Sequence, residues 1–225
     1  MPIRAELLAE IRSALGSAIS PGVTSRTSAS DVYEAYVFSM ILRAARIEGA
    51  GIRFEGRTGA VPTTFVFRSS PGYLYSDKHD YSHAVIEFPN APALEAHVSV
   101  RVSAVSKVLH ECDIALIDRN EALTCRANRV SPRNTKIPLA VECKFYASGL
   151  PLDLARSFVG LAKELSGKNR FLVYNTEASS VEQMLGHYDH KWEHHIVPSS
   201  LTEVERLRNA FQTAFKNYKA TSRRT

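Results

Sequence analysis

The hydrophobic period of this 225-residue chain changes from helical to strand-like and back, and this restricts the fold more than any other feature. Apolar residues before residue 50 recur at helical spacing. Five later segments are instead rich in β-branched and aromatic residues with turn residues between them, as in strands. These segments are residues 63–69, 83–88, 95–102, 109–118 and 137–146. Helical spacing then returns, so we expect an α/β or α+β fold in which helices flank a central mixed sheet.

Two helices joined by a linker are predicted near the N-terminus. The first carries apolar residues at helical spacing: Ile3, Leu7, Leu8, Ile11 and Leu15. Residues 17–30 are rich in Ser, Thr, Pro and Gly, which is typical of a linker. Asp31 is predicted to cap a longer helix, which Gly49 and Gly51 would end.

The C-terminal part is predicted to contain a strand–helix–strand unit and a final helix. Leu154, Phe158 and Leu161 line one face of the helix that follows the strand at 137–146. Residues 170–175 are a short apolar run typical of a buried strand, so the two strands should be parallel neighbours. We therefore expect a helix and linker (1–29), one domain (30–200), and a basic helix packed on that domain (201–225).

Composition excludes several classes of protein. Hydrophobic residues make up 44% and charged residues 23%, which excludes a wholly disordered chain, a collagen-like repeat and a disulfide scaffold. The three cysteines are an odd number without CxxC spacing. Glu6 and Glu10 interrupt the apolar residues at the start, unlike in a secretory signal, and no apolar run is long enough for a membrane span. We expect a cytoplasmic protein with no membrane partner.

Ionisable residues in two of the predicted strands carry the chemical information. Asp113 is surrounded by apolar residues in the segment 109–118, and Glu142 and Lys144 lie two apart in the segment 137–146. Strand side chains alternate between faces, so Glu142 and Lys144 project to the same side. Burying such groups is unfavourable unless something there uses them.

A divalent metal ion would use these groups. Mg²⁺ prefers oxygen ligands and takes one or two carboxylates from a protein, with Mn²⁺ as a substitute. Asp113 and Glu142 could supply them, with the main-chain carbonyl of Cys143 as a third ligand. Lys144 could then orient or deprotonate the attacking water, as in metal-assisted hydrolysis of a phosphodiester.

Asp113 followed by Glu142-Cys143-Lys144 resembles the D…(D/E)xK signature of the restriction-endonuclease-like, PD-(D/E)xK nuclease superfamily. The two acids are separated by 28 residues, and Cys112 stands where the family name has proline. Glu34 is similar to the glutamate that many members carry on the helix before the sheet, where it completes the acidic cluster. Arg156, Ser157 or Lys163 would supply polar groups from the helix after the ExK strand. The resemblance covers about residues 30–175.

The resemblance implies a restriction-endonuclease-like core and a function. It implies a Mg²⁺-dependent nuclease that cleaves DNA, with RNA not excluded, of restriction or antiviral-defence type. Catalysis would depend on Asp113, Glu142, Lys144 and Glu34. Cutting both strands requires two active sites, so we expect a homodimer. A partner subunit or an activating ligand of a defence system is a further expectation.

Several of these residues have an alternative interpretation. Asp113, Glu142 and Lys144 could form a buried ion-pair network without chemistry. Glu34 lies three residues after Asp31, which also fits a capping box. Glu111 could be an extra ligand, but a surface acid is favoured. The alternative function is a catalytically silent nuclease-like subunit that binds nucleic acid or a protein.

Histidines and cysteines elsewhere give weaker patterns. Residues 187–195 contain four of the eight histidines, but no HExxH pattern or cysteine accompanies them, so polar surface is favoured over zinc. Cys112 and Cys143 are interpreted as small core residues.

The formal charge of +5 is unevenly distributed. Residues 206–225 contain six basic residues and no acid, and residues 119–136 contain five basic residues against Glu121 alone. The rest of the chain therefore carries a net charge of −5. The segment 119–136, interpreted as a loop, could neutralise nucleic-acid phosphates together with a helical arginine, although a solvated loop and a frayed tail explain the two basic segments almost as well. The predicted contacts are Arg119, Arg126, Arg129, Arg133, Lys136 and Arg156.

Overall fold

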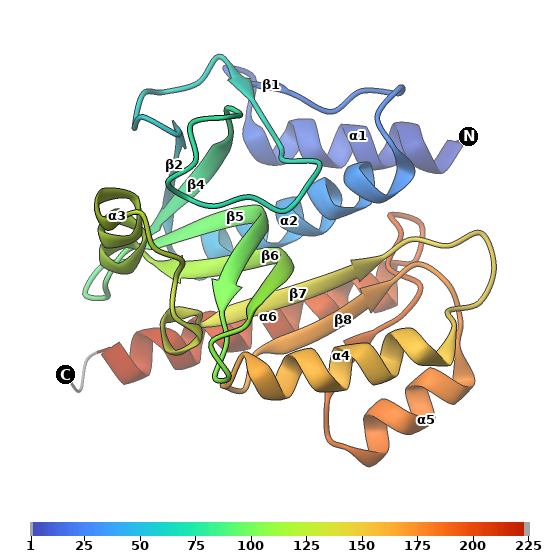
Figure 1. Cartoon of the computed structure of the whole chain (residues 1–225). Coiled ribbons are helices and arrows are strands. Elements are labelled where there is room, and N and C mark those ends of the chain that lie inside the picture. Colours follow the sequence, from blue (N-terminus) through green and yellow to red (C-terminus); the bar gives the residue numbers. More distant parts are fainter. Residues whose placement is uncertain (1, 223–225) are drawn as a thin grey trace.

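One seven-stranded mixed sheet organises the molecule. The computed structural model describes residues 2–222 and has helices on both faces of this sheet (Figure 1). The strands lie in the order β2-β4-β5-β6-β7-β8-β9, antiparallel from β2 to β7 and parallel from β7 to β9. The predicted fold class, a central mixed sheet flanked by helices, is confirmed.

Four of the five predicted strands match sheet strands to within two residues. The sheet consists of β2 (Gly51–Gly56), β4 (Ser82–Glu87), β5 (Leu94–Ser103), β6 (Leu109–Asp118), β7 (Leu139–Lys144), β8 (Arg170–Tyr174) and β9 (Lys191–Glu193). A separate parallel pair consists of β1 (Ser20–Pro21) and β3 (Thr64–Phe65). The predicted strand–helix–strand unit is present, because β7 and β8 are parallel neighbours with α4 between them in sequence.

The helices match the apolar periodicity closely at both ends of the chain. They are α1 (Pro2–Leu15), α2 (Ala29–Ile47), α3 (Arg119–Asn128), α4 (Leu152–Glu164), α5 (Ser179–His187) and α6 (Leu201–Ser222), with a short 3-10 helix at Asn134–Lys136. No helix within residues 2–222 is long and apolar enough to cross a membrane.

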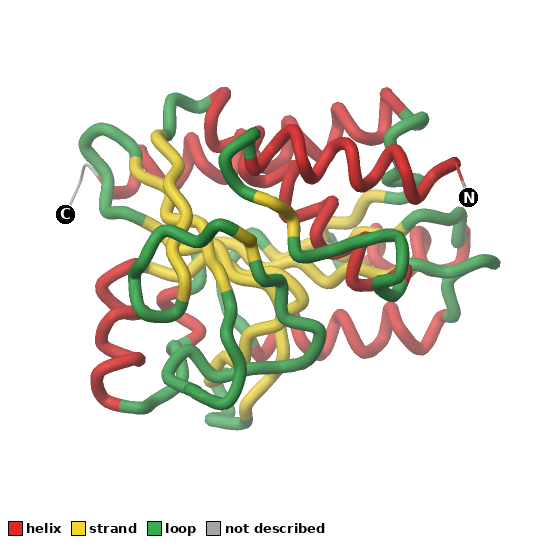
Figure 2. The backbone as a smooth tube through the Cα atoms, turned by 90° about the horizontal axis from the view of Figure 1, so that it is seen from above, coloured by secondary structure: helices red, strands yellow, loops and turns green. Residues whose placement is uncertain are grey.

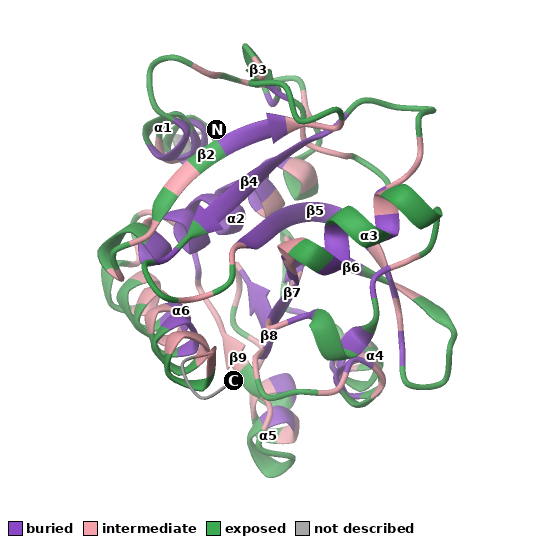
Figure 3. Ribbon diagram, turned by 90° about the vertical axis from the view of Figure 1, so that its left-hand side faces the viewer, coloured by how far each residue is buried: buried purple, intermediate pink, exposed green. Residues whose placement is uncertain are grey.

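The main core lies between the sheet and the helices α1, α2 and α6. Figure 2 shows these layers from above, and Figure 3 shows how fully the central strands are buried. α2 is buried on almost every side, which explains why its sequence is apolar around most of its circumference. Ile11 of α1 and Phe211 of α6 belong to the same apolar cluster as α2. Both terminal helices therefore pack on the central domain; Arg223 and Arg224 of the basic tail lie outside the described residues.

The opposite face of the sheet carries α3, α4 and α5 over two smaller apolar clusters. One contains Val100, Ile117 and Ala122, and the other contains Phe158, Leu172 and Leu185. Successive side chains of β7 point to opposite faces of the sheet. Val141 and Cys143 lie in the main core, and Ala140 lies in a cluster on the other face. Glu142 and Lys144 are thereby directed to the side of α4.

The predicted cap of α2 is wrong by three residues. Ser28 is the N-cap, and its hydroxyl accepts a hydrogen bond from the Asp31 amide at 3.1 Å. Asp31 therefore lies inside the first turn, where its charge favours the helix N-terminus. Serine and aspartate are both good caps, so composition alone did not discriminate between them.

Tertiary contacts changed other predicted elements. Of the predicted strand 63–69 only Thr64–Phe65 forms, paired with β1 rather than with the sheet. The segment 119–136, expected as a loop, begins with the helix α3, capped by Asp118 and ended by Arg129 in the left-handed conformation. The strands β2 and β9 were not predicted. They are short edge strands, in which few residues alternate between a buried and an exposed face.

Candidate active site

The predicted catalytic residues meet where β6 and β7 separate. The two strands pair from Leu116–Leu139 to Ile114–Val141, and no pair follows, although β7 continues beside β8 as far as Lys144. Asp113 is the first residue of β6 beyond this pairing. Its Oδ2 accepts a hydrogen bond from the Cys143 amide at 2.8 Å, so a carboxylate replaces the missing main-chain acceptor. The sheet thus opens at the predicted acid.

Lys144 joins the two predicted metal-binding carboxylates. Its Nζ lies 3.1 Å from Asp113 Oδ2 and 3.1 Å from Glu142 Oε2. The two oxygens therefore lie no farther apart than twice that distance. An ammonium group stands between two acids that a divalent ion could share after a small rearrangement.

Glu34 reaches the same region from α2. The Ser99 hydroxyl donates a hydrogen bond to Glu34 Oε2 at 3.3 Å. Since Ser28 caps the helix, Glu34 is not the third residue of the first turn and does not form the alternative capping box. Its carboxyl group is close enough to Asp113 and Lys144 for both to affect its pKa. Glu34 therefore belongs electrostatically with the residues at the strand separation.

Ser99 is a member of the site that the sequence did not indicate. It is buried, and its φ of 49° lies in the left-handed region, where a residue with a side chain is strained. The neighbouring pairs Val98–Ile114 and Val100–Cys112 place it opposite Asp113. Residues two apart in a regular strand share a face, but Val98 lies in the main core and Val100 in the opposite cluster. The regular alternation of β5 is therefore interrupted at Ser99. In the sequence, Ser99 is one of several polar residues that alternate with apolar ones along β5, so nothing local singled it out.

Burial and mutual repulsion favour the protonated forms of two acids in this site. Burial first, and then the charge of Asp113, raise the pKa of Glu34 to about 9 and that of Glu142 to about 8. Burial alone would lower the pKa of Lys144, but Glu142 and Asp113 outweigh it and hold that pKa above its usual value. With these partners Lys144 is a protonated hydrogen-bond donor, so it is suited to orienting water rather than deprotonating it.

A cavity of about 280 Å³ opens beside these residues. Asp113, Glu142 and Lys144 form one wall, and Ser157 and Phe158 of α4 form part of the other. Glu111 also lines the cavity and is exposed, as expected for an acid at the edge of the surface. The other two polar residues predicted from α4, Arg156 and Lys163, are exposed and do not line it.

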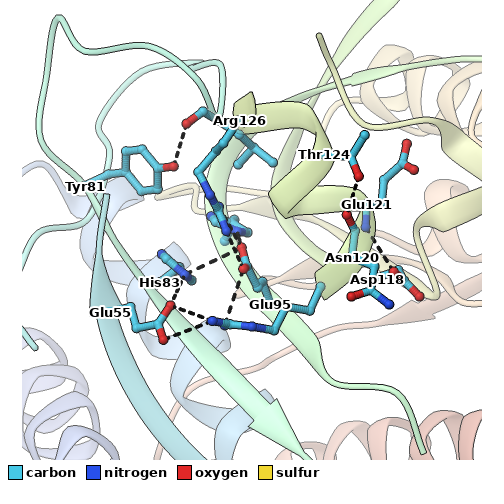
Figure 4. A network of polar contacts seen from close by, with 12 residues as sticks. Glu55, Tyr81, His83, Glu95, Asp118, Asn120, Glu121, Thr124 and Arg126 are labelled. Atoms are coloured by element: carbon cyan, nitrogen blue, oxygen red, sulfur yellow. Dashed lines mark hydrogen bonds and ion pairs between the residues drawn. The ribbon is translucent and has the colours of Figure 1, made fainter. Parts of the chain in front are cut away.

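Three of the predicted phosphate-binding arginines are instead neutralised within the chain. Arg126 donates to both oxygens of Glu95, and Arg119 pairs with Glu55 and Glu95. Arg133 donates from Nε to Glu121 at 2.9 Å. Figure 4 shows Arg126 directed at Glu95 in the interior rather than at solvent. These pairs join α3 and the segment after it to acids on three elements: Glu95 on β5, Glu55 on β2 and Glu121 on α3 itself.

The remaining three predicted contacts are available to a ligand. Arg129, Lys136 and Arg156 are exposed, and none has a carboxylate within 4.0 Å in the part of the chain that the structure describes. Their role in binding nucleic acid stays a prediction.

His83, Glu95 and His97 form a buried polar group next to these arginines. Their ligand atoms lie within 4.8 Å of one another, closer than those of any other three such residues between residues 2 and 222. However, the two imidazole rings stack at 4.8 Å and 19°, so their lone pairs do not converge on one point. Glu95 is already bound by Arg126, and a metal ion would add charge beside two guanidinium groups. We interpret this group as part of an ion-pair network, called here the Glu95 network (Glu55, His83, Glu95, His97, Arg119 and Arg126).

The remaining predictions concern histidines and cysteines. His194 pairs with Glu182 at 2.7 Å and His190 contacts Phe158, so the residues 187–195 do not converge on a metal site within the described chain. Cys112 and Cys143 are buried, as predicted for core residues, and Cys125, for which no such prediction was made, is buried too. The carbonyl of Cys143 as a metal ligand stays a prediction.

Comparison with protein-family models, curated proteins and solved structures found no match to this chain. The assignment of a function therefore depends on the residues of the site.

Proposed function

We propose that this chain is a metal-dependent nuclease that hydrolyses phosphodiester bonds in DNA. One observation supports the proposal most: Asp113, Glu142 and Lys144 come from two strands and meet at a separation of the sheet that faces a cavity. Buried ionisable groups at such a position are typical of active sites. The D…ExK motif has the chemistry that the PD-(D/E)xK resemblance implies.

The donor groups suit Mg²⁺, or Mn²⁺ as a substitute. Asp113 and Glu142 offer carboxylate oxygens, Glu34 offers another, and the Cys143 carbonyl is the proposed main-chain ligand. Burial raises the pKa values of Glu34 and Glu142, and the charge of Asp113 raises them further, so a cation beside these groups would favour their ionised forms. A bound divalent ion would supply that positive charge, polarise the phosphoryl group and acidify a water molecule.

The residues of the chain would position the reacting groups. The Lys144 ammonium would hold the water molecule and offset the charge on the phosphoryl oxygens. Ser99 would fix the orientation of Glu34, and the amide of Cys143 would fix that of Asp113. In the reaction the water oxygen bonds to phosphorus while the bond to the leaving sugar oxygen breaks. The water loses a proton to solvent, and the leaving oxygen takes one up.

Several finer expectations belong to this proposal. We propose a cytoplasmic, restriction-type or defence-associated endonuclease that acts as a homodimer, because cutting both strands requires two such sites. RNA is an additional substrate to test. An activating ligand or a partner subunit would explain a chain that is inactive by itself.

Plasmid cleavage tests the proposal. Purified protein is incubated with supercoiled DNA and Mg²⁺, Mn²⁺ or EDTA, beside the variants Asp113→Ala and Lys144→Ala. Asp153→Ala and Lys163→Ala remove the same charges from exposed positions of α4 and are the matched controls. Cleavage that needs the metal and is lost only in the first two variants supports the proposal. Equal behaviour of all five proteins contradicts it.

One observation favours the alternative of a catalytically silent subunit. Lys144 contacts both acids and partly neutralises them without a metal ion. Titration calorimetry with Mg²⁺ discriminates between the two functions. A silent subunit should bind nucleic acid without binding Mg²⁺ at Asp113, and its affinity should be the same in EDTA.

A further inference from the structure

Four flat side chains form a stack beside the candidate active site. The rings of Tyr73 and Tyr75 are stacked, with centroids 5.1 Å apart and planes at 23°. The Cζ of Arg101 lies 5.5 Å from the centre of Tyr73, and that of Arg129 lies 5.3 Å from the centre of Tyr75. Both tyrosines are half-buried and Arg129 is exposed. We call these four residues the arginine–tyrosine stack.

The main chain attaches this stack to the strand that carries Ser99. The Gly72 amide donates to the Ser99 carbonyl at 2.9 Å, and the Arg101 amide donates to the Gly72 carbonyl at 3.0 Å. Arg101 is also paired across the sheet with Glu111, which lines the cavity of the candidate active site. One end of the stack is therefore a single strand away from that cavity.

The two arginines of the stack differ from their neighbours in having no acidic partner. Neither Arg101 nor Arg129 has a carboxylate within 4.0 Å in the described part of the chain, whereas Arg119, Arg126 and Arg133 each have one. A tyrosine ring holds each guanidinium in place by a cation–π contact. The edge N–H groups remain available to an external acceptor, and a phosphate matches them in geometry.

A hollow of about 620 Å³ adjoins the far end of the stack. Tyr73, Tyr75 and Arg129 line it together with Lys78, and its acids are Asp77 and Asp80. Its volume lies within the range of sites that bind small organic groups such as a nucleotide. Aromatic rings, guanidinium planes and a nearby ammonium suit a group that is both flat and anionic.

We propose that the arginine–tyrosine stack binds an unpaired stretch of the nucleic-acid strand that enters the active site. Unpaired bases stack on aromatic rings and on guanidinium planes, and the phosphates between them accept hydrogen bonds from arginine. A base would extend the stack on the exposed guanidinium of Arg129. This inference rests on the proposed nuclease function, and it names single-stranded or unwound DNA as the substrate region that the chain recognises.

Binding in EDTA tests the proposal without requiring cleavage. Fluorescence anisotropy is measured with a labelled oligothymidine of about 20 nucleotides, near the span of one or two single-strand sites, and with a duplex of equal length. The variants are Arg129→Gln, Arg101→Gln and Tyr75→Leu. Arg133→Gln is the matched control, because it removes an exposed arginine charge that already pairs with Glu121. Thermal melting checks the folding of each variant.

We expect wild type to prefer the single strand. Tyr75→Leu should weaken this binding about tenfold and leave duplex binding unchanged, because the Tyr75 ring holds the Arg129 guanidinium on which only an unpaired base can stack. Arg129→Gln and Arg101→Gln should each weaken it and lower the salt dependence by about 0.7 per lost contact, whereas Arg133→Gln should not.

Three results would overturn the inference. They are no binding of the single strand by wild type, equal losses in Arg129→Gln and Arg133→Gln, and a Tyr75→Leu variant that folds and binds like wild type. Because Tyr75 is half-buried, a failure of its variant to fold leaves the two arginine variants to decide. Binding by a chain that shows neither metal-dependent cleavage nor Mg²⁺ binding at Asp113 would refute the nuclease proposal and leave the binding surface in place. Metal-dependent cleavage together with unchanged single-strand binding in the variants would support the nuclease proposal and overturn the role of the arginine–tyrosine stack.

Discussion

Two buried polar clusters in this protein have the same local sequence pattern but opposite surroundings. Glu95 and His97 lie two apart on β5, and Glu142 and Lys144 lie two apart on β7. Around Glu95, the side chains of Arg119 and Arg126 complete an ion-pair network in which the Glu95 carboxylate is fully buried. Around Glu142, Lys144 is the single cation of the described chain that pairs with both Asp113 and Glu142, and a cavity adjoins these residues. A cluster that is closed and charge-balanced contributes to the fold, whereas one that is open and short of positive charge can bind a ligand.

The pKa values of the acids differ in the same direction. Burial alone would raise the pKa of Glu95, but hydrogen bonds from His97 and Arg126 hold it well below its usual value. In Glu142 the effect of burial dominates, and the pKa rises to about 8. Glu95 is therefore ionised in the folded protein, whereas Glu142 is partly protonated near neutral pH. The difference arises from the hydrogen-bond donors and cations within reach: His97 and Arg126 donate to Glu95, whereas within residues 2–222 Lys144 alone donates to Glu142.

The largest expected effect is a loss of cleavage when the cluster around Glu142 is changed. Asp113→Asn keeps an acceptor for the Cys143 amide but removes the charge, so we expect cleavage to fall by about a thousandfold or more with little change in stability. The rate of plasmid nicking and the thermal melting temperature provide the measurement, with Asp153→Asn as control. Cleavage by Asp113→Asn within tenfold of wild type would mean that the open cluster is not the active site.

The second expected effect is a loss of stability when the Glu95 network is changed. Glu95→Gln leaves Arg126 and Arg119 without their buried charge partner, and we expect the free energy of unfolding to fall by about 3 kcal/mol. Urea denaturation measures this, with Glu87→Gln on the neighbouring strand as the control. Glu87 is exposed and pairs only with Arg53, so its loss should be below about 1 kcal/mol. Similar losses in the two variants would show that the Glu95 network does not stabilise the fold.

The third effect concerns the strained residue at the edge of the open cluster. Ser99→Ala and Ser99→Gly both remove the hydrogen bond to Glu34, and we expect either to reduce cleavage by about tenfold to a hundredfold. Glycine also relieves the positive φ, so the glycine variant should be more stable than the alanine variant by about 1 kcal/mol. Unfolding and cleavage are measured on both. Two variants that cleave as fast as wild type would remove Ser99 from the positioning of the site.

The smallest effect is a pair of opposite pH slopes in the metal-free protein. The folded pKa of Glu142 is raised from 4.5 to about 8, so its contribution to stability is complete below pH 4.5 and is lost as pH rises to about 8. The pKa of His97 is lowered from 6.5 to about 4, mainly by burial, so its contribution is present above 6.5 and is lost as pH falls to about 4.

Urea denaturation across pH measures both slopes. Glu142→Gln should flatten the decline between pH 7 and 8, and His97→Gln should flatten the decline below pH 6.5. Because a metal ion binds the ionised acids, Mg²⁺ affinity should also rise between pH 7 and 9 in wild type. An affinity that is independent of pH would argue against Glu142 and Glu34 as ligands.

Much of the fold and three members of the site were predictable from local pattern. The alternation along β7 assigned Glu142 and Lys144 to one face, and the structure has them there. Asp113 was recognisable as an acid within an apolar strand. Ser99 was not recognisable, because its importance arises from a backbone conformation and from a contact with Glu34, 65 residues away. The Glu95 network had a visible signal, two polar residues alternating in an apolar strand, but nothing local revealed its arginine partners.

The sequence by itself determined the helices α1, α2, α4 and α6, most strands of the sheet, the parallel pairing of β7 and β8, and the residues that share a face. These properties follow from side-chain periodicity, which acts over a few neighbouring residues. Only the tertiary structure decided which charges meet. It paired Arg119 and Arg126 with Glu95, left Arg101 and Arg129 without a carboxylate within 4.0 Å among residues 2–222, and separated β6 from β7 at Asp113. Contacts between distant segments depend on how helices pack on the sheet, and periodicity carries no information about that packing.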